Sequence, residues 1–190
     1  IIDRLPLHPR LARMLLAAGG APQAARAVAF LYEGPRVSGS RAATSCDLWS
    51  AVHDDVMPPG AARVARDMRA MLAGVSVRVQ DTISEDDFRR AVLAGYPDRL
   101  ARRRAPGRDR LLLASGTGAR LGRESGVVHH EFIVAIDVSA GDATGDAVVR
   151  MASGVEREWL VPTSSTVEHT FDTEAGLVRA RWVSRYDAIT

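Results

Sequence analysis

The sequence contains no lysine, because all 25 of its basic residues are arginine. This absence excludes a lysine-dependent phosphate-binding loop and a lysine that forms a Schiff base. The single cysteine, Cys46, excludes an intramolecular disulfide and fits a reducing compartment. No apolar run approaches the roughly 20 residues that a membrane-spanning helix needs, and no export signal is recognisable. We therefore expect a cytoplasmic protein without a membrane partner.

Charge is distributed unevenly along the chain. Residues 1–128 hold 20 arginines against 13 acidic residues, whereas residues 129–190 hold 5 arginines against 10 acidic residues. A genome-wide bias toward arginine and alanine accounts for the arginine content but not for this separation. A basic first part and an acidic second part predict two surfaces with different partners.

The first part of the sequence has the apolar spacing of amphipathic helices. Leu11, Met14, Leu15 and Ala18 recur at helical intervals after Pro9, which suits the first turn of a helix. Similar patterns, with recognisable start and stop signals, follow along the chain. The predicted helices begin at Pro9, at Pro22, at Ser45, after Pro58-Pro59, at Ser84 and at Pro97, and the last of them carries Arg99 to Arg104.

After Pro106-Gly107 the apolar spacing changes to alternation, which is typical of strands. Short strands separated by Gly, Asp, Ser and Thr favour a small barrel or sandwich. We place a boundary near residue 107, so that 1–107 form a helical domain and 108–190 a β-domain, with an incomplete C-terminus of that domain as an open alternative. The predicted strands are 110–114, 131–138, 147–152, 158–161, 166–171 and 177–183, with a hairpin loop at 172–176.

Four segments resemble, in order and at compatible spacing, segments of one helicase family. Residues 5–16 (LPLHPRLARMLL) resemble the opening of the helicase-associated domain of DEAH-type helicases. Residues 87–104 (DFRRAVLAGYPDRLARRR) resemble a later helix of that domain, in the version of the bacterial HrpB branch. Residues 112–121 (LLASGTGARL) and 131–137 (EFIVAID) resemble the start of that branch's OB-like domain and its next strand. Each segment alone is weakly specific, whereas four in series are strongly specific.

The resemblance implies an α+β fold, with a helicase-associated helical bundle followed by a small antiparallel OB-like β-barrel. It also implies RecA-like motor lobes with a winged-helix domain upstream and a further region downstream, and a first residue other than Met agrees with a piece of a longer protein. ATP and Mg²⁺ would bind to the motor lobes, so we expect neither a cofactor nor a catalytic residue in this fragment. The implied partners are the motor lobes, single-stranded nucleic acid, with RNA favoured over DNA, and a regulatory protein on the β-domain.

The densest group of arginines lies between residues 99 and 110, where six arginines accompany one acidic residue, Asp109. Guanidinium forks suit phosphate oxygens, so the functional interpretation is a phosphate-contacting strip beside a nucleic-acid channel. A solvated helix face in an arginine-biased protein is the alternative. On the functional interpretation, joint replacement of Arg102, Arg103 and Arg104 would weaken strand binding and leave thermal stability unchanged. The predicted nucleic-acid-binding residues are Arg99, Arg102, Arg103, Arg104 and Arg108, together with Arg120 and Arg123 in a glycine-rich loop of the β-domain.

Two further features of the β-domain admit a functional and a structural interpretation. The glycines of residues 115–122 lack the spacing of a nucleotide-binding loop, and no lysine follows them, so we predict a tight turn between strands. Trp159 and Trp182 are expected in the core of the β-domain, with stacking on a base as the alternative.

The adjacent residues His129, His130 and Glu131 would point to alternate sides of an extended chain, and no partner cluster with ligand spacing accompanies them. We therefore expect no metal site. The alternative to a nucleic-acid function is a protein-interaction scaffold, whose acidic β-domain docks a basic partner or another domain of the same chain. Salt-dependent association with single strands distinguishes the two functions, because a pure scaffold would show none.

Overall fold

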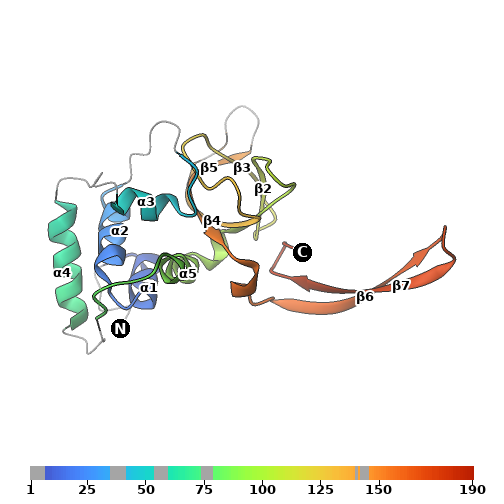
Figure 1. The fold of residues 1–190 in the computed structure, drawn as a ribbon, viewed down its shortest axis with the longest axis horizontal. Helices are drawn as coiled ribbons and strands as arrows, with labels where there is room; N and C mark the ends of the chain where they lie inside the picture. Colours follow the sequence, from blue (N-terminus) through green and yellow to red (C-terminus); the bar gives the residue numbers. More distant parts are fainter. Residues whose placement is uncertain (1–6, 35–41, 54–59, 74–78, 140, 142–145) are drawn as a thin grey trace.

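The computed structural model describes residues 7–34, 42–53, 60–73, 79–139, 141 and 146–190. A helical part and a barrel lie side by side, and a long hairpin projects away from both (Figure 1). No helix in these ranges is long and apolar enough to cross a membrane. The helices are α1 (Pro9–Ala17), α2 (Pro22–Tyr32), α3 (Asp47–His53), α4 (Ala61–Ala73) and α5 (Glu85–Gly95), with short 3-10 helices η2 (Pro97–Arg99) and η3 (Arg157–Trp159). The strands are β1 (Leu100–Arg103), β2 (Arg110–Leu113), β3 (Gly118–Leu121), β4 (Phe132–Ser139), β5 (Ala147–Val155), β6 (Ser164–Asp172) and β7 (Leu177–Arg185).

Local sequence explains where the helices begin and end. Pro9 and Pro22 occupy the first turns of α1 and α2, where a missing N–H removes no helical hydrogen bond. The hydroxyl of Ser84 accepts a hydrogen bond from the N–H of Asp87 at 3.1 Å and caps α5, as predicted. Gly20, with a φ of 65°, lets the chain reverse between α1 and α2. Residues 5 and 6 of the first resembling segment and Pro58-Pro59 before α4 lie outside the described residues.

Strands β1 to β5 close into a barrel in the order β1-β2-β3-β5-β4. Five closed strands beside a helical part confirm the predicted α+β class and are consistent with an OB-like fold. Four of the five strand pairs of the barrel are antiparallel, as predicted, and one departs from this pattern, because β3 and β5 run parallel. The chain passes through β4 between these two strands. Because β5 runs opposite to β4, it returns in the same direction as β3 and closes the barrel parallel to it.

The helix predicted from Pro97 through Arg104 is wrong. Only Pro97–Arg99 forms a helical turn, and the chain then continues as β1, which pairs with β2 on one side and β4 on the other. Leucine, alanine and arginine favour helices locally, but two ladders of main-chain hydrogen bonds and burial of Leu100 and Ala101 outweigh that preference.

One prediction between the strands is also wrong, and another is right only in part. The strand predicted at 158–161 does not form: Arg157–Trp159 make the 3-10 turn η3, in which the N–H of Trp159 donates to the carbonyl of Glu156 at 3.1 Å, and residues 160–161 follow without regular structure. The turn predicted at 115–122 is confined to its first residues, where Gly116 has a φ of 84°. Residues Gly118–Leu121 form β3, because they pair with both β2 and β5. Their glycine-rich sequence alone does not predict a strand.

Strands β6 and β7 do not belong to the barrel. They pair only with each other, in a two-stranded antiparallel sheet whose loop lies at the predicted position. Figure 1 shows this hairpin extending well beyond the barrel. Trp182, expected in the core, therefore has 68% of its surface exposed.

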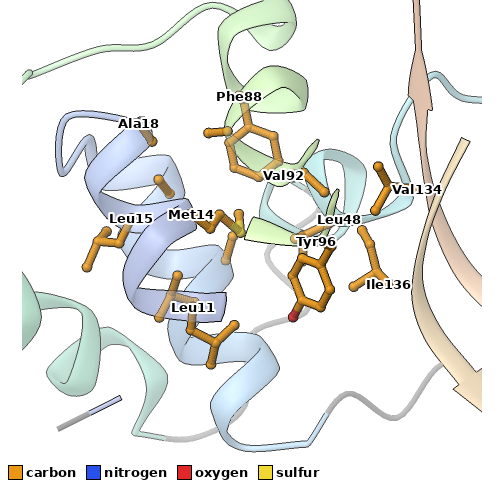
Figure 2. Packing of buried hydrophobic residues seen from close by; sticks show 14 of the residues in the cluster. Leu11, Met14, Leu15, Ala18, Leu48, Phe88, Val92, Tyr96, Val134 and Ile136 are labelled. Atoms are coloured by element: carbon orange, nitrogen blue, oxygen red, sulfur yellow. The ribbon is translucent and has the colours of Figure 1, made fainter. Parts of the chain in front are cut away.

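The largest apolar cluster joins the helices to the barrel. Phe88 of α5 is fully buried among residues of α1 and α3, and Val134 and Ile136 of β4 belong to the same cluster (Figure 2). A second cluster fills the barrel interior and includes Leu111 and Ile133. Since the larger cluster contains side chains from before and after residue 107, helices and barrel stabilise each other.

Asp47, the first residue of α3, is a buried carboxylate at this junction. Its oxygens accept hydrogen bonds from the hydroxyl of Ser125 at 2.6 Å and from the N–H groups of Gly126 and Ala152, each at 2.8 Å. These donors come from the segment before β4 and from β5. The carboxylate therefore ties one helix to two separate parts of the barrel.

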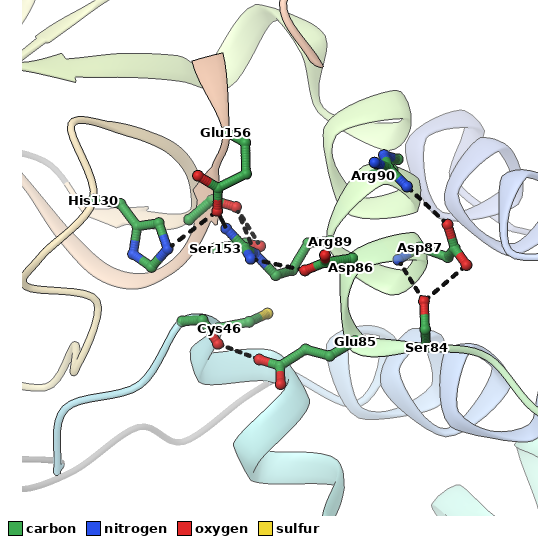
Figure 3. Close-up of polar contacts among 12 residues, drawn as sticks. Cys46, Ser84, Glu85, Asp86, Asp87, Arg89, Arg90, His130, Ser153 and Glu156 are labelled. Carbon is green, nitrogen blue, oxygen red and sulfur yellow. Dashed lines mark hydrogen bonds and ion pairs between the residues drawn. The ribbon is translucent and has the colours of Figure 1, made fainter. Parts of the chain in front are cut away.

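Arg89 of α5 makes the second polar link between helices and barrel. Its side chain is buried and donates to the carbonyl of Gly154 at 3.0 Å and to Glu156 at 2.5 Å (Figure 3). The ring of Trp159 lies 4.8 Å from the guanidinium carbon. Trp159 is thus half-buried against this arginine, beside the barrel core rather than within it.

His130 lies beside this network, with its Nε2 3.6 Å from Glu156 (Figure 3). Burial lowers the pKa of His130 below its ordinary value, and the positive charge of Arg89 lowers it further. The unfolded chain therefore binds a proton at a higher pH than the folded protein, and stability should fall as the pH drops below about 6.5.

Thermal melts at about pH 7.5 and about pH 5.5 should show a smaller acid-induced decrease in melting temperature for His130→Gln than for the unchanged protein. The exposed neighbour provides the control, since His129→Gln should keep the full decrease; equal behaviour of the two variants would refute the assignment.

Candidate nucleic-acid interface

The connection between β1 and β2 presents two exposed arginines, Arg104 and Arg108. Its main chain is held in place, because the N–H of Arg104 donates to the carbonyl of Arg110 at 3.0 Å. Neither exposed side chain makes a hydrogen bond or an ion pair with another described residue. Both guanidinium groups are therefore available to a phosphate without the loss of a contact in the fold.

Arg102 faces outward from β1 but already has a partner. Its Nε donates to Glu131 at 3.0 Å, and the guanidinium of Arg157 binds the same carboxylate at 2.8 Å. Burial raises the pKa of Glu131, but the hydrogen bonds and charges of Arg157 and Arg102 outweigh it, so the pKa lies below its ordinary value. Glu131 is thus ionised at neutral pH, and Arg102 would have to leave an ion pair to bind phosphate. Arg99, in η2, is half-buried.

Arg103 faces the opposite way, with only 6% of its surface exposed. Its guanidinium donates to the carbonyl oxygens of Val127 at 2.7 Å and His130 at 2.9 Å, and also to the carbonyl of Arg108. Burial lowers the pKa of Arg103, but a guanidinium remains charged at any physiological pH. Arg103 therefore holds the β1–β2 connection and the segment before β4 together, and we leave it out of the proposed interface.

A second group of arginines gathers on the outer face of β2, β3 and β5. The strand register places Arg110 opposite Arg120, and Arg120 opposite Val148. Arg150 follows on the same side of β5, between two buried residues. Arg120 thus lies in a strand rather than in the predicted loop, and Arg123 lies in the turn that follows. We call Arg110, Arg120, Arg123 and Arg150 the β-face arginine cluster.

Three members of the cluster, Arg120, Arg123 and Arg150, line a pocket of about 360 Å³. Arg123 and Arg150 are exposed, and neither makes a hydrogen bond or an ion pair with another described residue. Arg110 is 3.4 Å from Asp146, in an ion pair exposed to solvent. The remaining residues that line the pocket are Gly122, Glu124, Ser139 and Val148.

The two groups of arginines are neighbours. The N–H of Leu121 donates to the carbonyl of Asp109 at 2.8 Å, which brings Arg108 close to the end of β3 and so to Arg123. No aromatic residue is among those that line the pocket, although base stacking is usual where such barrels bind single strands. The arrangement therefore suits phosphate groups of a backbone better than bases.

Arg150 is the residue that sequence reasoning missed. It is isolated within the acidic part of the chain, so a search for runs of charge passes over it. The strand predicted at 147–152 contains the necessary signal, because alternation places Arg150 on the face opposite to Val149, whose side chain lies in the barrel interior.

Neither a metal-binding group nor a reactive thiol is found among the described residues. Within them, no group of three or more His, Cys, Asp or Glu side chains is placed to hold a metal ion. Complete burial raises the pKa of Cys46 to about 11, so its thiol stays protonated and packed in the core.

Comparisons with known proteins agree with the helicase resemblance. No family model and no curated protein matches the chain. A crystal structure of the E. coli DExH-box NTPase HrpB is 26% identical, with a TM-score of 0.71 and a match over 96% of this chain and 22% of that protein. A crystal structure of the E. coli DEAH/RHA helicase HrpB is 25% identical, with a TM-score of 0.75 and a match over 100% of this chain and 23% of that protein. The predicted resemblance to HrpB is confirmed over the whole chain, which spans less than a quarter of those proteins.

Proposed function

We propose that this chain is the accessory part of an ATP-dependent, HrpB-type helicase and that it guides a single strand of nucleic acid along its surface. The similarity to HrpB over the full length of the chain carries this proposal. Motor lobes elsewhere in the same polypeptide would bind ATP and Mg²⁺ and supply the movement. The described residues would contribute binding, with RNA as the preferred strand.

The strand would be held by its phosphates along the β-face arginine cluster and the β1–β2 connection. Arg104, Arg108, Arg123 and Arg150 are exposed and lack partners among the described residues, so binding costs no ion pair. Such contacts carry no sequence information, which suits a protein through which any strand must pass. The connection between β1 and β2 and the face of β2 and β3 are also where OB-like barrels bind oligonucleotides.

The scaffold alternative has less support from the geometry. Two of the three acidic residues of the projecting hairpin are not free to attract a basic partner, because Glu168 is paired with Arg181 and Arg185, and Asp172 with Arg179. Electrostatic recruitment through an acidic β-domain would first have to break these pairs.

A salt titration of binding to single-stranded RNA tests the proposed function. If about three phosphates are neutralised, a log–log plot of affinity against salt concentration should have a slope of about −2. Joint replacement of Arg108, Arg123 and Arg150 by alanine should reduce affinity at low salt by at least about tenfold and make the slope clearly shallower, with the remaining arginines of the surface retaining part of the salt dependence. The thermal melt should stay unchanged, because none of the three side chains has a partner in the described fold.

A control variant removes the same charge elsewhere. Arg13, Arg63 and Arg66 are exposed on α1 and α4, so their joint replacement by alanine lowers the net charge equally. This variant should keep the affinity and the slope. Equal losses of affinity in both variants would show that binding depends on net charge and not on this surface. The proposal would be refuted if the unchanged protein showed no salt-dependent binding.

A further inference from the structure

The projecting hairpin of β6 and β7 has two chemically different faces. Residues paired across an antiparallel ladder lie on the same face, and successive residues alternate between faces. The pairs Val167 with Trp182 and Phe171 with Val178 therefore share one face. We call this the apolar face, and its residues are Val167, His169, Phe171, Val178, Ala180 and Trp182.

The opposite face carries the charges of the hairpin. Glu168, Asp172, Arg179, Arg181 and Arg185 occupy alternate positions there and form ion pairs with one another. Both strands thus have the alternating pattern of a sheet with one solvated and one buried side. The charged side faces water except near the barrel end of the hairpin, where Val183 on the same side is buried, whereas the apolar side has nothing described that covers it.

The exposure of the apolar face is large for side chains of this type. Phe171 has 60% of its surface exposed, Val178 62% and Trp182 68%. An isolated two-stranded hairpin is at best marginally stable in water, and contiguous exposed apolar side chains mark an interaction site. Since the hairpin projects away from the barrel, packing on the described fold supplies no cover (Figure 1).

We propose that the apolar face docks against an apolar surface in another region of the same full-length polypeptide, outside these 190 residues. This inference rests on the proposed function, because an HrpB-type protein is more than four times as long as this chain, as the matched share of 22–23% shows. That length supplies a covering surface within one molecule, at a high effective concentration. The hairpin then acts as an arm that fixes the barrel to the rest of the helicase.

The chemistry of the face favours a protein surface over a nucleic acid or a second copy of the chain. No arginine lies on the apolar face, so a strand would have to bind there by stacking on Phe171 and Trp182 alone, without the phosphate contacts that dominate its affinity. A second copy would leave the arm exposed in every monomer, whereas an intramolecular partner covers it at any concentration.

Hydrogen exchange on the full-length protein tests the docking. The variant Phe171→Ser/Trp182→Ser alters the apolar face alone. The matched control, Arg179→Ser/Arg181→Ser, alters the opposite face of the same strand pair. In the unchanged protein and the control, amides of residues 164–185 should exchange at least about tenfold more slowly than in the apolar-face variant. Exchange in residues 100–121 should be equal in all three, which shows that the barrel remains folded.

The remaining outcomes separate the alternatives. Protection that is independent of protein concentration and of added single-stranded RNA supports intramolecular docking. Protection that appears only at high concentration, together with a dimer in light scattering, overturns it in favour of a second copy; protection that appears only with RNA overturns it in favour of strand binding. Rapid exchange in every variant also overturns it. None of these results alters the affinity loss expected for the arginine cluster, so the two proposals fail separately.

Discussion

Replacing Asp47 by alanine is expected to lower the free energy of unfolding by about 3 kcal/mol or more, and the melting temperature by about 6–12 °C. The carboxylate is fully buried and accepts hydrogen bonds from Ser125, Gly126 and Ala152. Alanine would leave all three donors without their acceptor in the protein interior. Each unsatisfied donor would lower the free energy of unfolding by about 1–3 kcal/mol. Denaturant titration followed by circular dichroism measures the change.

Two further variants distinguish the hydrogen bonds from general effects of substitution. Asp47→Asn keeps the shape and one acceptor oxygen, but its amide group would meet a donor, so we expect only a small part of the loss to be recovered. Asp67→Ala removes an exposed carboxylate from α4, where the nearest arginine is 3.9 Å away, and should change stability by less than about 0.5 kcal/mol. Equal stability of Asp47→Ala and Asp67→Ala would contradict this account of the junction.

The helices were the more predictable half of the fold because their signals are local. Proline in a first turn, the serine cap of α5 and apolar residues at helical spacing all act within a few positions of the chain. Strands β2, β4 and β5 were also predictable from alternation. Strands β1 and β3 were not, because each exists through its two neighbouring strands rather than through its own sequence.

Prediction of the site was limited by the same distinction. Arg102, Arg103 and Arg104 are adjacent in the sequence, so they are predicted as one group. In a strand, however, the side chains of successive residues point to opposite sides and contact different partners. Arg150 lies in the cluster because β5 pairs in parallel with β3. The distribution of charged residues along the sequence does not predict that pairing. Arg120 and Arg123 are predicted in a glycine-rich loop, whereas Arg120 lies in β3 and Arg123 in the turn that follows it.

Arg103 and Arg104 offer the sharpest test of this difference, because they are adjacent and chemically identical. Arg103→Ala should destabilise the fold by about 2–4 kcal/mol, since the carbonyls of Val127, His130 and Arg108 lose a charged donor in the barrel wall. Arg103→Lys should recover little of this, because one ammonium group does not match three acceptors held by a planar fork. Arg104→Ala should leave the melt within about 0.5 kcal/mol of the unchanged protein and weaken single-strand binding instead.

The triple replacement of Arg102, Arg103 and Arg104 should consequently lower the thermal melt, contrary to what the sequence alone predicts. Its loss of stability should be at least that of Arg103→Ala, with a smaller addition from the ion pair of Arg102 with Glu131. Its loss of affinity, measured below the melting transition, should match that of Arg104→Ala. Stability and binding would then divide between two neighbouring arginines according to the side of β1 and its following turn that each one faces. A stable triple variant would show that the inward guanidinium contributes nothing to the fold and would return Arg103 to the group of strand-binding candidates.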